Sequence, residues 1–359
     1  MLAPMSEPAQ SDTFCLAPLR GVTVRTFRNL HALWFTPPDR AVAPFIPTFA
    51  GEKVKPLLLK DVDPELGQGV PVVPQVIGKD PAQLRTLLRA FKAMGYDCAD
   101  LNAGCPYPFI VRKGRGAGLM RDEATFARML EVGCEELPQG FSVKVRLGID
   151  RPDLLAARMA VINGFPLREI TIHARTARQM YAGAVDLQMF AVALEACRHP
   201  VVYNGDLRTR ADFLLLKTRF PQITRWMVGR AAAADPFVFA RLAAELPPPR
   251  DPVRLKGFLD DYFAACEEEL YGPVSVLGRM KELWSYLHQS LAGGERIWKG
   301  VRVCRALHEY RRVVDAVFAS FPGFVPDDML RGVRLEENGL CASGDAVPRD
   351  GCSDCNECP

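Results

Sequence analysis

A single thiol, Cys105, lies in a segment whose residue types suit chemistry at a binding site. The segment LNAGCPYPFIVRKGRGAGLM spans residues 101–120, and no acidic residue occurs between Cys105 and Arg121. The basic residues that follow the cysteine are Arg112, Lys113, Arg115 and Arg121. Nearby cations favour a nucleophilic thiolate, whereas a general acid must keep its proton until it is needed. The alternative is a small apolar residue at a strand end. We therefore treat Cys105 as a candidate acid or nucleophile beside a glycine-rich loop that we expect to be flexible.

Two further side chains stand out because the segments around them are apolar: Lys144 in VKVRLG and His173 in TIHAR. Burying a lysine is costly unless its charge meets a partner, and a phosphate or an electron-rich ring edge would serve. In a barrel, Val143 and Val145 would face the surrounding helices and Lys144 would point inward. The alternatives are a lysine at the solvent-facing end of a strand and a histidine satisfied within the core. We favour the inward, functional lysine.

Two short glycine-containing motifs, YNGD at 203–206 and VGR at 228–230, end the last two strand-like segments. Barrel enzymes often hold a phosphate at this place, on glycine amides beside other donors. Asn-Gly on its own is a common turn. Taken together, the motifs predict a phosphate site that includes Gly205, Gly229 and Arg230.

Strand-length apolar segments alternate with helical patterns between residues 14 and 245, which predicts an α/β fold, a (β/α)8 TIM barrel. The eight segments are 14–19, 41–45, 70–78, 98–104, 141–148, 169–175, 200–206 and 225–231. The rival is a doubly wound open sheet, but no Gly-x-Gly-x-x-Gly turn follows the first segment. In a barrel, polar residues at the carboxyl ends of the strands meet in one site. These are Gln75, Asn102, Cys105, Lys144, Arg146, His173, Arg175, Asn204, Asp206 and Arg230.

The pattern changes after a proline-rich linker at 243–252. The region that follows has amphipathic helical runs, at 276–291 and 300–320, and no strand rhythm. From Arg279 to Arg312 it has eight Lys or Arg against three Glu. We therefore predict three parts: a catalytic barrel at 14–245, a small all-helical domain with a basic surface at 251–320, and a loop-like Cys-rich tail at 321–359.

The net charge of the chain is only +3, so a polyanionic partner must bind a local basic patch. No apolar run is long enough to span a membrane, and the first residues do not resemble a signal peptide. We therefore expect a cytoplasmic protein with no membrane partner. No stable protein partner is indicated, so we expect a monomer.

Four of the eleven cysteines lie at the C-terminal end with the spacing of a metal site. They are Cys341, Cys352, Cys355 and Cys358, in a C-x10-C-x2-C-x2-C pattern. Four such thiols would hold an iron–sulfur cluster or a zinc ion. The alternative is a tail with redox-prone cysteines and no metal.

Seven motifs between residues 14 and 315 resemble the tRNA-dihydrouridine synthase family in their order and spacing. They are LAPLRGVT, VPQVIG, DLNAGCPYPFIVRKGRGAGLM, SVKVRLGID, ITIHARTARQMYAG, VVYNGDL and MVGRAAAADPFVF, and GRMKELWSYL resembles the C-terminal domain of that family. The resemblance implies an FMN-bearing barrel with a helical tRNA-binding domain. NADPH would reduce the flavin, the flavin would pass a hydride to C6 of a uracil, and Cys105 would protonate C5. The product would be 5,6-dihydrouridine.

The resemblance also assigns residues to the two ligands. FMN contacts are expected from Ala17, Pro18, Leu19, Gln75, Lys144, His173, Asn204, Gly205, Asp206, Gly229 and Arg230. Substrate contacts are expected from Asn102, Arg112, Lys113, Arg115, Arg175, Arg178, Arg279 and Lys281. A uracil stacked in folded tRNA must be flipped out to reach a flavin, and basic residues would hold the phosphates.

Some positions depart from the pattern of that family. The family commonly has Met in place of Leu19, a small polar pair in place of Tyr107 and Pro108, Asn in place of Arg112, and Glu in place of Asp206. The changes after Cys105 bear on the substrate, so the alternative is an FMN reductase of the same family that acts on another RNA or on a small unsaturated molecule. A non-catalytic RNA-binding protein is disfavoured, because it would have no use for a complete set of flavin and acid residues.

Overall fold

The strands of the computed structural model form one curled, parallel sheet. The structure describes residues 11–51, 54–67, 69–330 and 332–333. The strand order in this part of the chain is β3-β5-β6-β7-β8-β9-β10-β1-β2-β4. The strands are β1 (Thr13–Leu16), β2 (Arg40–Val42), β3 (Ile46–Pro47), β4 (Val72–Val73), β5 (Gln75–Ile77), β6 (Ala99–Ala103), β7 (Phe141–Gly148), β8 (Glu169–Thr176), β9 (Val201–Asn204) and β10 (Arg225–Val228). All but β3 overlap a predicted segment; β3 follows directly after the segment predicted at 41–45.

The two ends of this strand order are the same pair of chain segments, so the sheet closes on itself. At one end β2 pairs with β4 through Ala41 and Val72, and at the other β3 pairs with β5 through Ile46 and Val76. Pro44 and Pro74 lie at the two interruptions, where the missing N–H breaks the ladder. Each interrupted pair therefore counts as one barrel strand, and the predicted TIM barrel of eight strands is confirmed.

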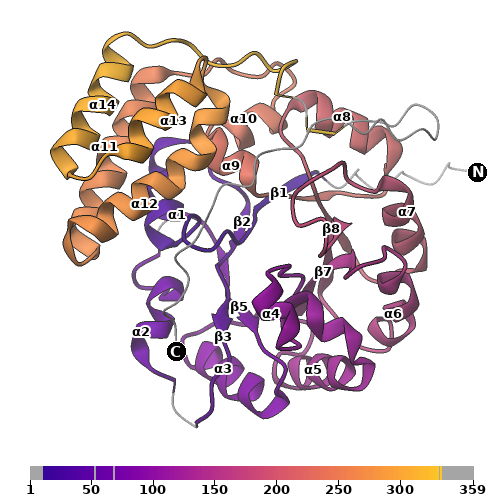
Figure 1. Cartoon of the computed structure of the whole chain (residues 1–359). Coiled ribbons are helices and arrows are strands. Elements are labelled where there is room, and N and C mark those ends of the chain that lie inside the picture. Colours follow the sequence, from indigo (N-terminus) through magenta and orange to yellow (C-terminus); the bar gives the residue numbers. More distant parts are fainter. Residues whose placement is uncertain (1–10, 52–53, 68, 331, 334–359) are drawn as a thin grey trace, which may run out of the picture.

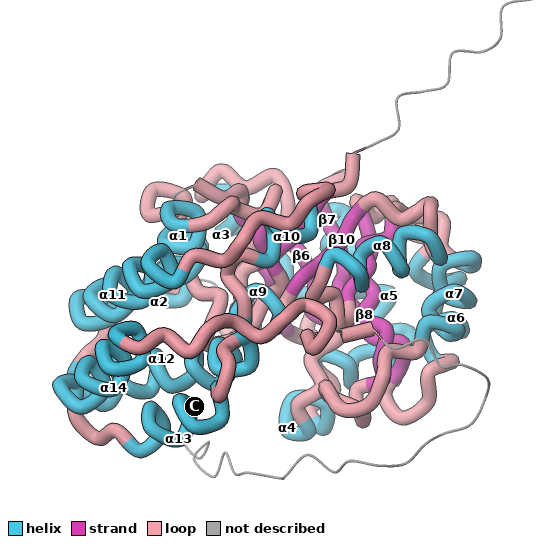
Figure 2. Tube along the Cα trace, turned by 90° about the horizontal axis from the view of Figure 1, so that it is seen from above, coloured by secondary structure: helices cyan, strands magenta, loops and turns pink. Residues whose placement is uncertain are grey.

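Helices surround the sheet on its outer side (Figure 1). The helices up to residue 243 are α1 (Arg25–Trp34), α2 (Pro56–Leu59), α3 (Pro81–Ala93), α4 (Pro108–Arg112), α5 (Glu123–Glu136), α6 (Leu154–Ile162), α7 (Leu187–Ala196), α8 (Arg210–Arg219), α9 (Arg230–Ala234) and α10 (Val238–Ala243). Of these, the short α4 lies near one end of the barrel and not on its outer side (Figure 2). The caps of α3 show why its ends could be read from the sequence. Asp80 Oδ1 accepts from the amides of Ala82 and Gln83 at 2.9 and 3.1 Å, and Gly95 has a φ of +90°.

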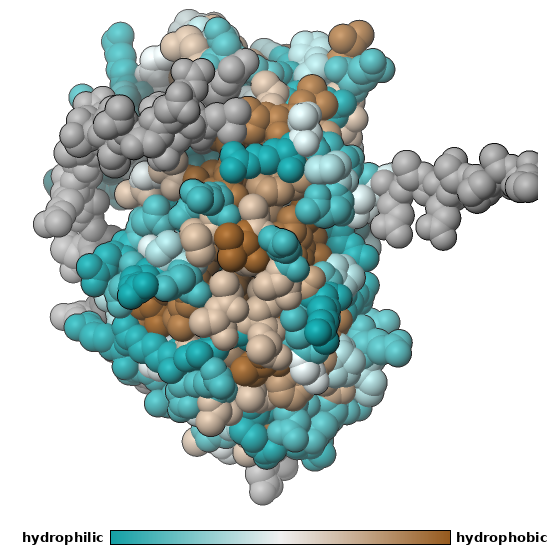
Figure 3. Space-filling view, turned by 90° about the vertical axis from the view of Figure 1, so that its right-hand side faces the viewer, coloured by the Kyte–Doolittle hydropathy of each residue, from teal (hydrophilic) through white to brown (hydrophobic). Residues whose placement is uncertain are grey.

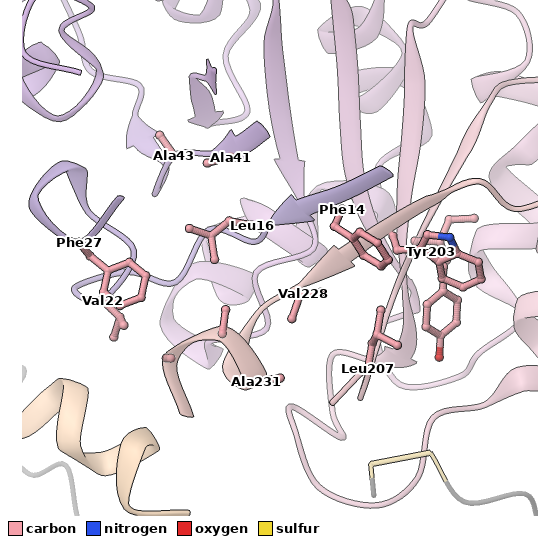
Figure 4. Packing of buried hydrophobic residues seen from close by; sticks show 14 of the residues in the cluster. Phe14, Leu16, Val22, Phe27, Ala41, Ala43, Tyr203, Leu207, Val228 and Ala231 are labelled. Atoms are coloured by element: carbon pink, nitrogen blue, oxygen red, sulfur yellow. The ribbon is translucent and has the colours of Figure 1, made fainter. Parts of the chain in front are cut away.

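Alternating side chains of the strands separate two apolar layers. In β1, Phe14 and Leu16 join the large cluster under the helices, part of which is drawn in Figure 4. Cys15 belongs to a small cluster inside the barrel, with Val202 and Met227. The same alternation holds in β7, where Val143 and Val145 pack outward and leave Lys144 on the inner side.

The C-terminal region of the described chain is helical, as predicted. It contains α11 (Pro252–Glu269), α12 (Gly272–Leu287), α13 (Gly294–Val303) and α14 (Leu307–Ala319). The run predicted at 300–320 is two helices, because the Glu309 carboxylate accepts from the amides of Arg305 and Ala306 and starts a new helix. The apolar cluster continues from the barrel into these helices. The division of the chain at residues 245–251 stays a prediction.

These helices lie beside the barrel together with α1 (Figure 2). On another face of the molecule, formed by α6 and α7, hydrophilic side chains surround hydrophobic ones (Figure 3). No helix in the described residues has the length and apolar character needed to cross a membrane.

Candidate active site

A cavity of about 1090 Å³, measured with its open mouth, lies at the carboxyl ends of the barrel strands. Its wall includes residues at the ends of β1, β6, β7, β8, β9 and β10 and two residues from α12. The predicted site residues on this wall are Ala17, Pro18, Leu19, Asn102, Cys105, Lys144, His173, Asn204, Gly205, Asp206, Gly229 and Arg230. Residues far apart in the sequence thus surround one space.

The backbone around Cys105 is held by Asn102 and by the loop that follows. The amides of Cys105 and Gly104 donate to Asn102 Oδ1 at 2.8 and 3.1 Å, and Cys105 O accepts from Ala117 N at 3.1 Å. Burial raises the pKa of the Cys105 thiol, and this outweighs the opposing effects of the Tyr107 backbone and of nearby cations such as Arg146. The thiol therefore keeps its proton at neutral pH, which suits a general acid better than a nucleophile.

The expectation of a flexible loop after Cys105 is wrong, because the loop is folded and packed. It forms α4 and a 3-10 helix, η2 (Gly116–Arg121), whose first five residues are buried. A Cβ on Gly116, which has a φ of +55°, would lie 2.8 Å from Cys105 Cβ. A Cβ on Gly118 would lie 2.3 Å from Val111 O. These glycines therefore permit close packing behind the thiol.

Lys144 and Arg146 reach the cavity from the same face of β7. Arg146 is engaged: its Nε donates to Gly104 O at 3.0 Å, and its Nη1 donates to Thr176 O at 2.9 Å. Lys144 makes no hydrogen bond or ion pair with any residue that the structure describes. Burial, followed by the charge of Arg146, lowers the pKa of Lys144 to about 8. A half-buried ammonium without a partner fits an anionic ligand.

Asp206 joins the ends of the last three strands. It accepts from Arg175 Nη1 at 3.0 Å and from Arg230 Nη2 at 2.8 Å, and it forms an ion pair with Arg175 Nη2. These contacts stabilise Asp206 in a left-handed backbone conformation, with a φ of +44°. Arg175 Nη1 also lies 3.4 Å from His173 Nε2. Burial, then the nearby cation Arg146, lowers the pKa of His173 well below its usual value, so its ring is neutral at pH 7.

Gln75 does not lie on the cavity wall. Its Oε1 accepts from Asn102 Nδ2 at 2.9 Å, and its Nε2 donates to Asp100 Oδ2 at 2.7 Å. Burial raises the pKa of Asp100 to about 6. Gln75 thus positions Asn102, which in turn positions Cys105.

The sequence matches the family model described as dihydrouridine synthase (Dus) over residues 15–315. The chain belongs to the dihydrouridine synthase family. Membership of this family makes it an oxidoreductase and implies a flavin cofactor.

Among related dihydrouridine synthases, the probable tRNA-dihydrouridine synthase of Rhodobacter capsulatus is 32% identical over 242 residues, which are 66% of this chain and 72% of that protein. The tRNA-dihydrouridine synthase B of Pseudomonas aeruginosa is 28% identical over 234 residues, 63% of this chain and 68% of that protein. Among solved structures, the old yellow enzyme from Trypanosoma cruzi aligns with a TM-score of 0.49 and 11% identity, over 70% of this chain and 94% of that one.

The basic residues predicted to contact the substrate lie outside the cavity wall. Arg112 and Lys113 are exposed on α4 and at its C-terminal end, and Arg115 is half-buried. Lys113 Nζ lies 4.1 Å from the centre of the Phe109 ring. These three cations follow Cys105 on and just after α4, and their contacts with substrate stay a prediction.

Three of the other predicted substrate cations, Arg178, Lys281 and Arg175, already have partners within the protein. Arg178 Nη2 pairs with Asp150 Oδ1 at 2.9 Å, and Lys281 Nζ donates to Cys304 O at 2.6 Å. Arg175 is buried and bound to Asp206. Arg279 is half-buried on α12.

Several residues on the cavity wall were not among the predicted ligand contacts. They include Arg20, Phe45, Arg146, Tyr181, Arg208, Glu282 and Tyr286. The sequence predicts Arg146 in the site at the strand ends, two residues after Lys144, but the family resemblance assigns it no ligand. No local pattern marks Glu282 and Tyr286, which belong to α12 and reach the cavity only through the packing of that helix.

The predicted metal ligands Cys341, Cys352, Cys355 and Cys358 lie outside the described residues. Within residues 11–333, as far as they are described, no group of three or more His, Cys, Asp or Glu side chains could hold a metal ion. The iron–sulfur or zinc site therefore stays a prediction for the tail.

Proposed function

We propose that the chain is a flavin-dependent tRNA-dihydrouridine synthase, which reduces a uridine of tRNA to 5,6-dihydrouridine. The observation that carries the proposal is a buried Cys105, whose pKa is raised by burial, in one cavity with Lys144, His173 and Arg230. The names of the two relatives described above support tRNA as the substrate.

The cavity fits flavin mononucleotide, FMN, in its charge and in the places that lack side chains. Five basic residues lie on its wall against two acidic ones: Arg20, Lys144, Arg146, Arg208 and Arg230 against Asp206 and Glu282. Lys144 would stabilise negative charge on the flavin ring. Gly205 and Gly229 lie on the wall with Arg230, and close packing disfavours a side chain at either position, since a Cβ would lie 2.8 Å from Val185 Cγ1 at the first and 3.2 Å from Ala17 Cβ at the second. When bound and reduced by NADPH, FMN would supply the hydride that C6 of the uracil accepts.

Cys105 supplies the proton for the other carbon of the double bond. Its S–H bond breaks, a C5–H bond forms on the uracil, and the thiolate left behind takes a proton from solvent. The charges of Arg146 and Lys144 favour that thiolate while it exists. Asn102 holds the Cys105 backbone, so the position of the thiol does not depend on the substrate.

Binding of tRNA requires that the target base leave its stack and enter the cavity. Arg112, Lys113 and Arg115 lie next to the thiol in the sequence and carry the charge needed for the phosphates. We further propose that Arg178, Arg279 and Lys281 contact the RNA, that NADPH is the reductant, and that the protein acts as a cytoplasmic monomer. The tail is proposed to hold an iron–sulfur cluster or zinc.

A second candidate is an FMN reductase of the same family with another RNA or a small unsaturated molecule as substrate. Tyr107, Pro108 and Arg112 favour it, because they depart from the family pattern next to Cys105.

Two measurements test the proposed function. The purified protein should be yellow and should release FMN on denaturation; a colourless preparation that takes up no FMN would exclude both candidates. Mass-spectrometric mapping of dihydrouridine in RNA from cells that lack the protein should show one mark missing from tRNA. If tRNA from these cells still carries every dihydrouridine, the first candidate is excluded and only the second remains.

A further inference from the structure

The outer surface of α4 combines an exposed aromatic ring with cations beside the active-site thiol. All twenty phenylalanines of the chain lie in its described part, and Phe109 is the only one that is exposed, at 61%. Two residues before it, Tyr107 is 51% exposed and contributes to the cavity wall. Tyr107 and Phe109 thus present two exposed aromatic rings beside a catalytic group, a surface on which a nucleotide base can stack.

The helix presents this surface in a fixed orientation. Val111 is buried in a small apolar cluster with Ala117 and Ile149, so the opposite side of α4 faces solvent. Phe109, Arg112 and Lys113 have the i, i+3 and i+4 spacing of one helical face. The Arg115 amide donates to Ile110 O at 3.1 Å, which ties the end of α4 to the packed segment behind Cys105.

The charges on this face of α4 favour RNA over a protein as its partner. Arg112 and Lys113 make no ion pair within the described residues, and Lys113 lies over the Phe109 ring. A protein surface that covers an apolar ring would have to bury these charges, whereas RNA supplies phosphates for them and a base for the ring. The surface also continues through Tyr107 into the cavity that would receive the target base.

We propose that α4 binds a nucleotide adjacent to the target uridine, with its base stacked on Phe109 and its phosphates at Arg112 and Lys113. The inference rests on the proposed function for the identity of the RNA. It adds Phe109 as the side chain that positions the RNA beside the extruded uridine.

The test measures the Kd of unmodified bulk tRNA, taken from cells that lack the protein, over a range of salt concentrations. Phe109→Ala should raise Kd about 5- to 150-fold through loss of one stacked base. Its salt dependence should stay that of the wild type, because no charge is lost. Phe109→Trp should restore the affinity. Lys113→Gln should instead lower the slope of log Kd against log salt by about 0.7–0.9.

Tyr271→Ala is the matched control, since Tyr271 is an exposed aromatic residue at the start of α12, 99% exposed and outside the proposed surface. It should leave Kd unchanged. A wild-type Kd for Phe109→Ala, or a salt slope that falls as in Lys113→Gln, would overturn the stacking proposal. So would a dimer that Phe109→Ala dissociates, seen by sedimentation. Flavin content and dihydrouridine formation, measured separately, report on the proposed function, so failure of one inference is distinct from failure of the other.

Discussion

Gly116→Ala should disturb the active site without removing any group that touches a ligand. The new Cβ would lie 2.8 Å from both Cys105 Cβ and Cys105 O, a distance at which something must shift. The left-handed backbone at this position, with a φ of +55°, costs an alanine about 1–2 kcal/mol. Overpacking against Cys105 adds about 1–3 kcal/mol. We therefore expect the free energy of unfolding to fall by about 2–5 kcal/mol.

Gly114→Ala separates the two contributions. Gly114 also has a positive φ, +69°, but the nearest atom to its Cβ is Lys79 Cδ at 3.5 Å, which is ordinary contact. This variant should lose only the backbone contribution of about 1–2 kcal/mol. Urea unfolding of both variants, compared with the wild type, gives the contribution of the contact with Cys105 as the difference between them.

Dihydrouridine formation provides the second measurement. A thiol displaced by about 1 Å is expected to lower kcat by roughly 100-fold, while flavin content should be unchanged in Gly116→Ala. Gly114→Ala should keep a kcat close to that of the wild type. Equal destabilisation of the two variants, or a wild-type kcat in Gly116→Ala, would refute the view that this glycine sets the position of the thiol.

Four further predictions concern single groups. Cys105→Ala should retain flavin and lose product formation, and turnover by this variant would exclude the acid role. The activity of the wild type should hold through neutral pH. It should fall only as the pH rises through the raised pKa of the thiol, above the ordinary value of 9.0. Asp206→Asn should lower the free energy of unfolding by about 3–5 kcal/mol, because it leaves the buried Arg175 and the half-buried Arg230 without their shared carboxylate. Asp150→Asn, in an exposed pair, should cost less than about 1 kcal/mol. Similar losses in urea unfolding would contradict this. Lys144 has a folded pKa of about 8, below its ordinary 10.5, so the unfolded chain binds more protons between these values and the stability of flavin-free protein should rise over that pH range; Lys144→Met should abolish the rise. Iron, sulfide and zinc analysis should find metal in the full chain and none in a 1–330 truncation, and equal contents would place the metal elsewhere or show that there is none.

Much of the fold could be predicted because its signals are local. Buried parallel strands are continuous apolar runs, and the capping residues of α3, Asp80 and Gly95, lie directly beside the helix in the sequence. The split of two barrel strands was missed because Pro44 and Pro74 interrupt pairing within runs that remain apolar. The break at residues 304–306 was missed because the amphipathic pattern continues across it, and only the Glu309 carboxylate shows where the new helix starts.

For the site too, local features could be predicted from the sequence, whereas contacts between distant residues could not. The strand period and the position of strand ends sufficed to predict that Lys144 and Cys105 face a common cavity. The period did not separate Gln75, which supports Asn102 from behind, from residues on the wall, since both kinds lie on the inner side of a strand. The glycines after Cys105 suggested flexibility, yet their spacing serves contacts with backbone atoms that the sequence does not place nearby.

By itself, the sequence determined which residues could do chemistry and that a parallel barrel would gather them, because residue type and strand period are local properties. Only the tertiary structure decided that Cys105 keeps its proton, that Arg175 binds Asp206, and that Glu282 and Tyr286 complete the cavity from α12. The physical reason is that a pKa, an ion pair and a cavity wall all depend on burial and on neighbours distant in the chain, and these are defined only when the whole chain has packed.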